Sequence, residues 1–210
     1  MLRDVKHLLW DVDGTLYKSE PDLLEAIQHE IYTRIAVGLS VPYEEARERY
    51  LALYARLGGA TATVVELGLN RRLIPDAVDS VDKTEYLKPD PKLRDMLEVT
   101  LRTFTHVIVT NTSRKGTLRT LELLGLSPMI FQGIVTADDV LRSKPDVEPY
   151  VKAQEITRSA AHQHVSIGDR EKVDILPARK LGMKTILVWG ASQMADASVP
   201  TVYDVPSVLV

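Results

Sequence analysis

The sequence predicts an α/β fold in which a parallel sheet carries an inserted helical lobe. After the first buried strand, residues 18–88 are rich in helix formers and lack runs of β-branched residues. From Pro91 onward, short apolar runs alternate with stretches of helical periodicity, a pattern typical of βαβ units with right-handed crossovers. We therefore expect one domain built from residues 1–17 and 89–210, and a second, helical domain over residues 18–88.

The first strand is expected to end in two acidic residues. Residues 8–10 form a short apolar run that stops at Asp11, and Asp13 and Gly14 follow. In an open parallel sheet, ligands bind at the carboxyl ends of the strands. One carboxylate would act as a nucleophile or metal ligand while the other exchanges a proton, and Gly14 would allow a sharp turn. Taken alone, the stretch is also typical of an acidic turn without a catalytic role.

Proline and glycine mark the ends of the helices expected in the inserted lobe. Pro21 opens a helix that Gly38 closes, and Pro42 opens a second helix that Gly58 closes. Both have apolar residues at helical spacing. Two shorter helices are expected over residues 61–67 and 75–81.

The elements after the lobe alternate between helix and strand. Asp90 and Pro91 provide the cap and first turn of a helix whose apolar stripe includes Leu93, Leu97 and Leu101. Strands are expected over 105–113, 131–140, 164–175 and 184–190, an edge strand over 201–205, and helices over 118–124, 148–158 and 176–181.

The composition excludes several classes of protein. Apolar residues make up 45% and charged residues 26% of the 210 residues, as in ordinary soluble proteins. The net charge of −3 gives no broad basic surface, so nucleic acid is not an expected partner. No apolar stretch approaches the ~20 residues that span a bilayer, and the first residues do not form a secretory signal. Because the chain has no cysteine, disulfides and thiolate sites are excluded, and the cytoplasm is the expected location.

Polar residues at several strand ends fit one site for phosphoryl transfer. Thr110 and Asn111 follow the second strand, Asp169 follows Gly168 at the end of a later strand, and Lys144 lies on a loop between them. A phosphate monoester carries about two negative charges, so a carboxylate nucleophile needs cations beside it. Mg²⁺ accepts carboxylates, water and substrate oxygen as ligands. The sequence therefore predicts a magnesium-assisted reaction at this edge of the sheet.

We expect distinct roles for the charged residues of this site. Asp11 would attack phosphorus and form an aspartyl-phosphate. Asp13 would protonate the leaving alkoxide and then take a proton from the water that cleaves the intermediate. Asp11, Asp169 and the main-chain carbonyl of Asp13 would bind Mg²⁺. Lys144 would hold the phosphate and the nucleophile together.

Three further residues would complete the site. The hydroxyl of Thr110 and the backbone N–H groups around Asn111 would bind the phosphate, and Asp174 would orient Lys144 or hold a water ligand of the metal. Taken singly, each site residue has a simpler interpretation. Thr110, Asn111 and Asp174 are typical of helix caps, Lys144 of a solvated loop and Asp169 of a turn. A single phosphate site accounts for all of them together.

Four motifs in this order resemble those of the haloacid dehalogenase superfamily of phosphatases: DVDGT at 11–15, VTN at 109–111, SKPD at 143–146 and IGDREKVD at 167–174. The resemblance spans nearly the whole chain and includes a small helical cap inserted after the first motif. It implies a three-layer Rossmann-like core, dependence on Mg²⁺ and the roles given above to Asp11, Asp13, Thr110, Lys144 and Asp169.

The second acid, Asp13, narrows the reaction that the resemblance implies. Halide-removing relatives lack it, so a phosphatase or a phosphomutase is expected. Phosphonate-cleaving relatives use a cap lysine. Here Lys18, Lys83 and Lys88 fall near the hinges or in a polar stretch, and no buried cap lysine is expected. We expect a phosphatase acting on a small phosphorylated metabolite, a nucleotide or sugar phosphate. A phosphomutase and a non-catalytic phosphate- or metal-binding module are the alternatives.

The cap is expected to meet the leaving group of the substrate and so to set specificity. Residues 52–68 and 87–97 loosely resemble the cap of pyrimidine 5′-nucleotidases. The sequence leaves the particular ester and the oligomeric state open. Candidates for substrate contact, with helix packing and capping as the alternative, are Tyr54, Arg56, Thr61 and Thr63.

Overall fold

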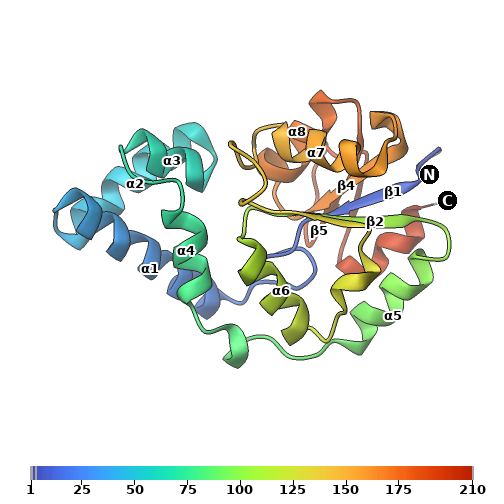
Figure 1. The fold of residues 1–210 in the computed structure, drawn as a ribbon, viewed down its shortest axis with the longest axis horizontal. Coiled ribbons are helices and arrows are strands. Elements are labelled where there is room, and N and C mark those ends of the chain that lie inside the picture. The colour runs from blue at the N-terminus through green and yellow to red at the C-terminus, as the bar shows by residue number, and fades with distance from the viewer. Residues whose placement is uncertain (1, 3, 210) are drawn as a thin grey trace.

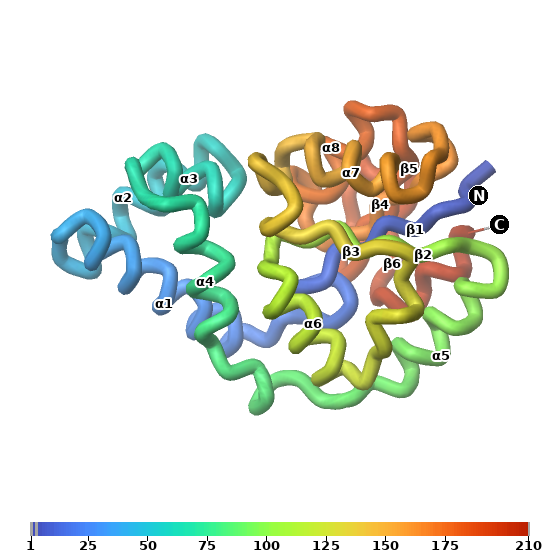
Figure 2. Tube along the Cα trace, in the orientation of Figure 1, coloured from blue at the N-terminus to red at the C-terminus, as the bar shows by residue number. Residues whose placement is uncertain are grey.

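The structure is a computed structural model that describes residue 2 and residues 4–209. Figure 1 shows a sheet with helices above and below it, and a separate group of helices beside it. The start of the first strand and the last helical turn, Val202–Val208, lie on the side of the sheet away from that group (Figure 2). None of the helices described has the length and apolar character that crossing a bilayer would take.

Six parallel strands form the sheet, in the order β3-β2-β1-β4-β5-β6. The central strand β1 pairs with β2 from His7↔Thr105 to Trp10↔Ile108, and with β4 on its other side. The predicted α/β fold with a parallel sheet is confirmed. The strand bounds are β1 His7–Trp10, β2 Thr105–Val109, β3 Gly133–Val135, β4 His164–Gly168, β5 Lys184–Val188 and β6 Ala197–Val199.

Side chains of β1 alternate between the two faces of the sheet, and helices cover both. Leu8 and Trp10 belong to the core under α5 Pro91–Thr100 and α6 Arg114–Leu123. Leu9 belongs to the core under α7 Glu148–Thr157 and α8 Leu176–Lys180. Every residue of β1 is buried, and after His7 the strand is apolar, as is typical of a parallel strand covered on both faces. The result is the three-layer, Rossmann-like arrangement (Figure 1).

The four helices beside the sheet have an apolar core of their own. It includes Ile31 and Ile35, Tyr50, Val64 and Ile74, which come from all four helices. No strand interrupts residues 21–80, all of which the structure describes. The helical character expected here is therefore confirmed, whereas the division into domains at residues 18 and 88 stays a prediction. The helices are α1 Pro21–Leu39, α2 Tyr43–Leu57, α3 Ala60–Glu66 and α4 Leu73–Ser80.

The prediction of an edge strand over residues 201–205 is wrong. The sixth strand is β6, four residues earlier, and residues 202–208 form a 3₁₀ helix. The side chain of Thr201 accepts from the backbone of Asp204, while the Asp204 carboxylate accepts from the Thr201 N–H, and this capping box starts the helical turn. The strand expected over 164–175 likewise ends at Gly168, and a π-helical turn occupies Glu171–Ile175.

Candidate active site

The predicted site residues meet at the carboxyl ends of the parallel strands. Asp11 follows β1, Thr110 follows β2 and Asp169 follows β4, while Lys144 comes from the segment between β3 and α7. A cavity of about 530 Å³ lies between this edge and helices α1–α4. Asp11, Asp13, Thr110, Asn111 and Asp169 all line it. The topology thus brings together residues that lie up to 158 positions apart in the chain (Asp11 and Asp169).

Helices α1–α4 contact the core directly through the turn before α4. The guanidinium of Arg71 donates to the carbonyls of Val140 and Leu141, each at 2.6 Å, and to that of Ala137 at 3.0 Å. These carbonyls lie between β3 and α7, in the segment that leads to Lys144. The helical group therefore covers the active-site edge of the sheet in this structure.

Lys144 bridges two buried carboxylates. Its Nζ lies 2.8 Å from Asp11 Oδ1 and 2.6 Å from Asp174 Oδ1, and the Lys144 side chain is 1% exposed. Although burial alone would disfavour the ammonium, Asp11 and Asp174 raise the pKa of Lys144 above its ordinary value. Lys144 is therefore a fixed cation beside the predicted nucleophile, and the alternative of a solvated loop lysine is excluded.

Thr15 joins the two carboxylates predicted to bind metal. Its hydroxyl donates to Asp11 Oδ2 at 2.9 Å and lies 3.5 Å from Asp169 Oδ1. Gly14 makes this approach possible, because its φ is +88° and a Cβ there would lie 2.6 Å from Asp169 Oδ2. Burial and the negative charge of Asp11 raise the pKa of Asp169 to about 7. Burial also raises the pKa of Asp11, against the opposing effect of Lys144.

The donor set of this site fits a hard divalent cation. Carboxylate oxygens of Asp11, Asp169 and Asp174 lie within 4.8 Å of one another. Both oxygens of Asp174 are already engaged, by Lys144 and by the backbone N–H of Arg170 at 3.1 Å. Asp11 and Asp169, which Thr15 joins, fit the predicted role of Mg²⁺ ligands, because Mg²⁺ prefers oxygen donors. Asp174 fits the predicted alternative in which it orients Lys144.

Asp13 lies near the same cavity with its carboxylate held by three donors. Lys83 Nζ donates to Asp13 Oδ1 at 2.7 Å, Tyr17 donates to the same oxygen, and Thr112 donates to Oδ2. Burial acts against the charge of Asp13, but the Lys83 ammonium and the two hydroxyls lower its pKa to about 2. The predicted binding of Mg²⁺ by the Asp13 carbonyl stays a prediction.

The buried position of Lys83 corrects the expectation that the cap contributes no buried lysine. Lys83 lies in a short 3₁₀ turn between α4 and α5, and its side chain is 7% exposed. It reaches Asp13 on one side and Thr120 Oγ1 of α6, at 3.3 Å, on the other. The polar sequence around it, DKTEY, is typical of a solvated linker. The Lys83 side chain is buried because this linker packs against α6.

The side chain of Asn111 binds the backbone of Lys144 and does not cap a helix. Its side-chain amide donates to the Lys144 carbonyl at 2.8 Å and its Oδ1 accepts from the Lys144 N–H at 2.9 Å. Thr110 is buried beside it, and its hydroxyl accepts from the Thr112 N–H. The N-cap of α6 is Ser113, so neither Thr110 nor Asn111 caps that helix. Their binding of phosphate stays a prediction.

Two residues that touch the site, Thr15 and Lys83, have no role predicted from the sequence. Thr15 stands inside the first motif, so proximity to a motif was the available signal. Thr112 directly follows the second motif and is on that ground a candidate for substrate contact; in the structure it donates to Asp13. For Lys83 no local signal existed. Among the candidate cap contacts, Tyr54 and Thr61 line the cavity. Arg56 pairs with Glu66, and Thr63 is fully buried and donates to a backbone carbonyl.

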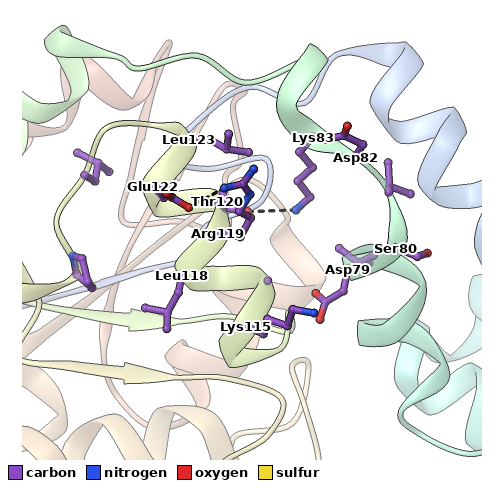
Figure 3. Close-up of a pocket in the computed structure, with 15 residues that line it drawn as sticks. Asp79, Ser80, Asp82, Lys83, Lys115, Leu118, Arg119, Thr120, Glu122 and Leu123 are labelled. Atoms are coloured by element: carbon purple, nitrogen blue, oxygen red, sulfur yellow. Dashed lines mark hydrogen bonds and ion pairs between the residues drawn. The ribbon is translucent and has the colours of Figure 1, made fainter.

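A second cavity lies behind Lys83, away from the predicted chemistry. It measures about 750 Å³ and separates the end of α4 and its linker from α6. Figure 3 shows Lys83 reaching across to Thr120, with Asp79 and Lys115 facing each other farther along the wall. None of the predicted catalytic or metal-binding residues, all within the described part of the chain, lines this cavity. The larger cavity is therefore not the candidate active site.

The chain is similar to known proteins over most of its length. A family model described as haloacid dehalogenase-like hydrolase matches residues 8–188. The phosphoglycolate phosphatase of Aquifex aeolicus is 28% identical, with 87% of this chain and 84% of that protein covered. The pyrophosphatase PpaX of Bacillus pumilus is 30% identical, with 86% and 82% covered. The crystal structure of a HAD phosphatase from Thermococcus onnurineus superposes with a TM-score of 0.68 at 23% identity and covers 98% of each chain.

Proposed function

The chain belongs to the haloacid dehalogenase-like hydrolases, and from that premise we propose that it is a magnesium-dependent phosphatase of small phosphate monoesters. The observation that carries the proposal is the triad Asp11–Lys144–Asp174, in which a buried ammonium lies 2.8 Å from the predicted nucleophile. Phosphatase activity is named for relatives such as the phosphoglycolate phosphatase and PpaX. This supports phosphate compounds as the substrate class.

The first half of the proposed reaction breaks the ester bond at Asp11. A carboxylate oxygen of Asp11 attacks phosphorus, the bond to the ester oxygen breaks, and an aspartyl-phosphate forms. Lys144 supplies one positive charge to the approaching dianion. Bound Mg²⁺, held by Asp11 and Asp169, would neutralise the repulsion between the carboxylate and the phosphate. Thr15 keeps both carboxylates oriented toward this point.

Asp13 performs the proton transfers of both halves. Because Lys83, Tyr17 and Thr112 hold Asp13 as a carboxylate in the free protein, it first takes up a proton, which it gives to the leaving alkoxide in the first half. In the second half it takes a proton from the water that attacks the aspartyl-phosphate, which releases inorganic phosphate and restores the Asp11 carboxylate. Lys83, Tyr17 and Thr112 fix the direction of the Asp13 carboxyl group. Asp11 thus acts as the nucleophile and Asp13 as the acid and base, because the two carboxyl groups have different neighbours.

The proposal is tested by following the fate of the phosphoryl group. With Mg²⁺ present, we expect inorganic phosphate to appear in a one-to-one ratio with alcohol from 4-nitrophenyl phosphate and from sugar phosphates. Sugar phosphate isomers formed without free phosphate would favour the phosphomutase alternative instead. Phosphorus NMR measures inorganic phosphate and the remaining sugar phosphates in the same samples. Absence of both products from a broad panel of monoesters would contradict the proposed function.

Replacement of Lys83 should reveal whether Asp13 protonates the leaving group. Alkoxides need a proton to leave, whereas 4-nitrophenolate does not. We expect Lys83→Met to lower kcat for an alkyl phosphate roughly tenfold to a hundredfold, and to change kcat for 4-nitrophenyl phosphate much less. The physical reason is the loss of the 2.7 Å contact that orients Asp13, an effect that we expect to outweigh the rise in the Asp13 pKa that follows removal of the ammonium.

A matched control for this variant is Lys88→Met, because Lys88 is exposed and donates only to the backbone carbonyl of Thr84. It should leave both rates unchanged. An equal loss on both substrates in Lys83→Met would assign Lys83 a purely structural role.

A further inference from the structure

The cavity over the active site has two chemically different surfaces. The formally charged side chains that line it lie at the sheet edge or directly beside it in the chain. None of the lining residues on α1–α4, all of which belong to the described chain, carries a formal charge. A phosphate group therefore fits at the sheet edge, and the rest of a substrate meets an uncharged wall. The charged residues of the lining are Asp11, Asp13, Lys18, Asp169 and Arg170.

The uncharged wall offers apolar surface to the cavity. Leu24 of α1 and Leu51 of α2 line it and are nevertheless 44% and 41% exposed. Ile31 and Ile74 also line the cavity but are largely buried in the core of the four helices. Large apolar side chains left exposed on one concave face mark a binding surface more often than isolated exposed residues do. The apolar wall is therefore suited to cover an apolar part of a ligand.

Three tyrosines give the same wall an aromatic character. The rings of Tyr50 and Tyr54 stack with centroids 5.6 Å apart and 17° between their planes. Tyr32 meets Tyr50 edge-on at 5.5 Å. Within residues 4–209, the hydroxyls of these tyrosines make no hydrogen bond to another side chain or to the backbone. Rigid rings of this kind bind flat or ring-shaped groups with little loss of side-chain entropy.

The size of the cavity favours a ligand larger than a two- or three-carbon ester. Its volume of about 530 Å³ falls in the range of roughly 300–1,000 Å³ found for sites of drug-sized ligands. A small hydroxy-acid phosphate would occupy only the sheet edge and would leave the apolar wall in contact with water. A substrate with a sizeable apolar alcohol would cover the exposed parts of Leu24 and Leu51.

From these observations we propose that the substrate is a phosphate monoester whose alcohol is uncharged and carries an apolar or aromatic ring system. The inference rests on the proposed phosphatase function and specifies its substrate class. Esters whose alcohol bears a carboxylate or a second phosphate are expected to be poorer substrates, because helices α1–α4 contribute no cation to the lining and its two cations, Lys18 and Arg170, lie outside these helices.

Three alkyl esters with leaving groups of similar reactivity test the proposal: ethyl phosphate, 2-phenylethyl phosphate and phosphoglycolate. We expect kcat/KM for the phenylethyl ester to exceed that for ethyl phosphate by roughly tenfold or more, since the phenyl ring is removed from water. Phosphoglycolate should be hydrolysed no better than ethyl phosphate. Phosphate release is the readout for all three.

A charge placed on the wall should change this preference. Leu51→Arg is expected to raise the ratio of kcat/KM for phosphoglycolate to that for 2-phenylethyl phosphate by about tenfold or more. The control is Val37→Arg, which adds the same charge to α1 at a side chain that is 77% exposed and does not line the cavity. That control should leave the ratio unchanged.

The outcomes separate this inference from the proposed function. Release of phosphate from all three esters with phosphoglycolate preferred, or with no preference, would overturn the inference and leave the phosphatase function standing. An unchanged ratio in Leu51→Arg would also overturn it, because the wall would then not contact the alcohol. Failure to release phosphate from any monoester in the presence of Mg²⁺ would overturn the proposed function itself.

Discussion

Asp11→Asn is expected to lower the rate of phosphate release by at least about a thousandfold. The amide is nearly isosteric and can still accept from Thr15, but it is a far weaker nucleophile than a carboxylate. It also removes one of the two negative charges that hold Lys144. The measurement is kcat for 4-nitrophenyl phosphate at saturating Mg²⁺.

Two controls make this result interpretable. Asp95→Asn changes an exposed carboxylate on α5, far from the cavity lining, and should keep full activity. Thermal unfolding of Asp11→Asn should remain a single cooperative transition, which shows that the loss is chemical. Turnover by Asp11→Asn at a rate close to that of the wild type would rule out Asp11 as the nucleophile.

Removal of Mg²⁺ is expected to abolish activity and to lower thermal stability. Among the residues that the structure describes, Arg170 is the one that forms an ion pair with Asp169, with its Nε 3.7 Å from Asp169 Oδ1. The carboxylates of Asp11 and Asp169 therefore repel each other unless a divalent ion joins them. At a Mg²⁺ concentration a hundred times Kd, binding contributes about 2.7 kcal/mol to the free energy of unfolding. For a chain of this size that corresponds to roughly 5–10 °C in Tm.

Asp169→Asn is the variant that isolates this effect. It removes a proposed ligand and also the repulsion with Asp11, so we expect its Tm without Mg²⁺ to be no lower than that of the wild type. Addition of Mg²⁺ should then leave its Tm nearly unchanged. An equal Mg²⁺-dependent rise in Tm for the variant and the wild type would place the ion elsewhere.

Local sequence patterns predicted that the candidate site residues meet at one edge of the sheet, because this arrangement follows from the topology. Each of Asp11, Thr110 and Asp169 directly follows an apolar strand, and parallel strands share their carboxyl edge. Hydrophobic periodicity and proline–glycine punctuation likewise indicated α1 and α2 to within a few residues. These features depend only on residues close together in the chain.

Features that depend on contacts between distant segments were not predictable in this way. Lys83 is buried only because its linker packs against Thr120 of α6. Asn111 reads as a capping residue, yet it binds the backbone of Lys144, 33 residues away. The prediction of a strand over residues 201–205 is wrong for a local reason. Thr201 and Asp204 form a capping box, which starts a helical turn in place of a strand. Propensity for a strand at residues 201–205 did not take this side-chain pairing into account.

The position of Lys83 also links the covering helices to the chemistry. The residue comes from the segment that joins α4 to the core, and it contacts the proposed proton donor Asp13 directly. A shift of helices α1–α4 relative to the sheet would change this contact. Entry of substrate and orientation of Asp13 are therefore expected to be coupled in this protein.

The central claim is that the phosphoryl group passes through a covalent bond to Asp11, and rapid chemical quenching during turnover tests it most directly. Peptide mass spectrometry of the quenched wild-type protein should find one phosphoryl group on the segment with residues 7–17, at Asp11. Hydroxylamine, which cleaves acyl phosphates, should remove it. A phosphoryl group on any other residue, or phosphate release under the same conditions without labelling of Asp11 at any quench time, would contradict the account.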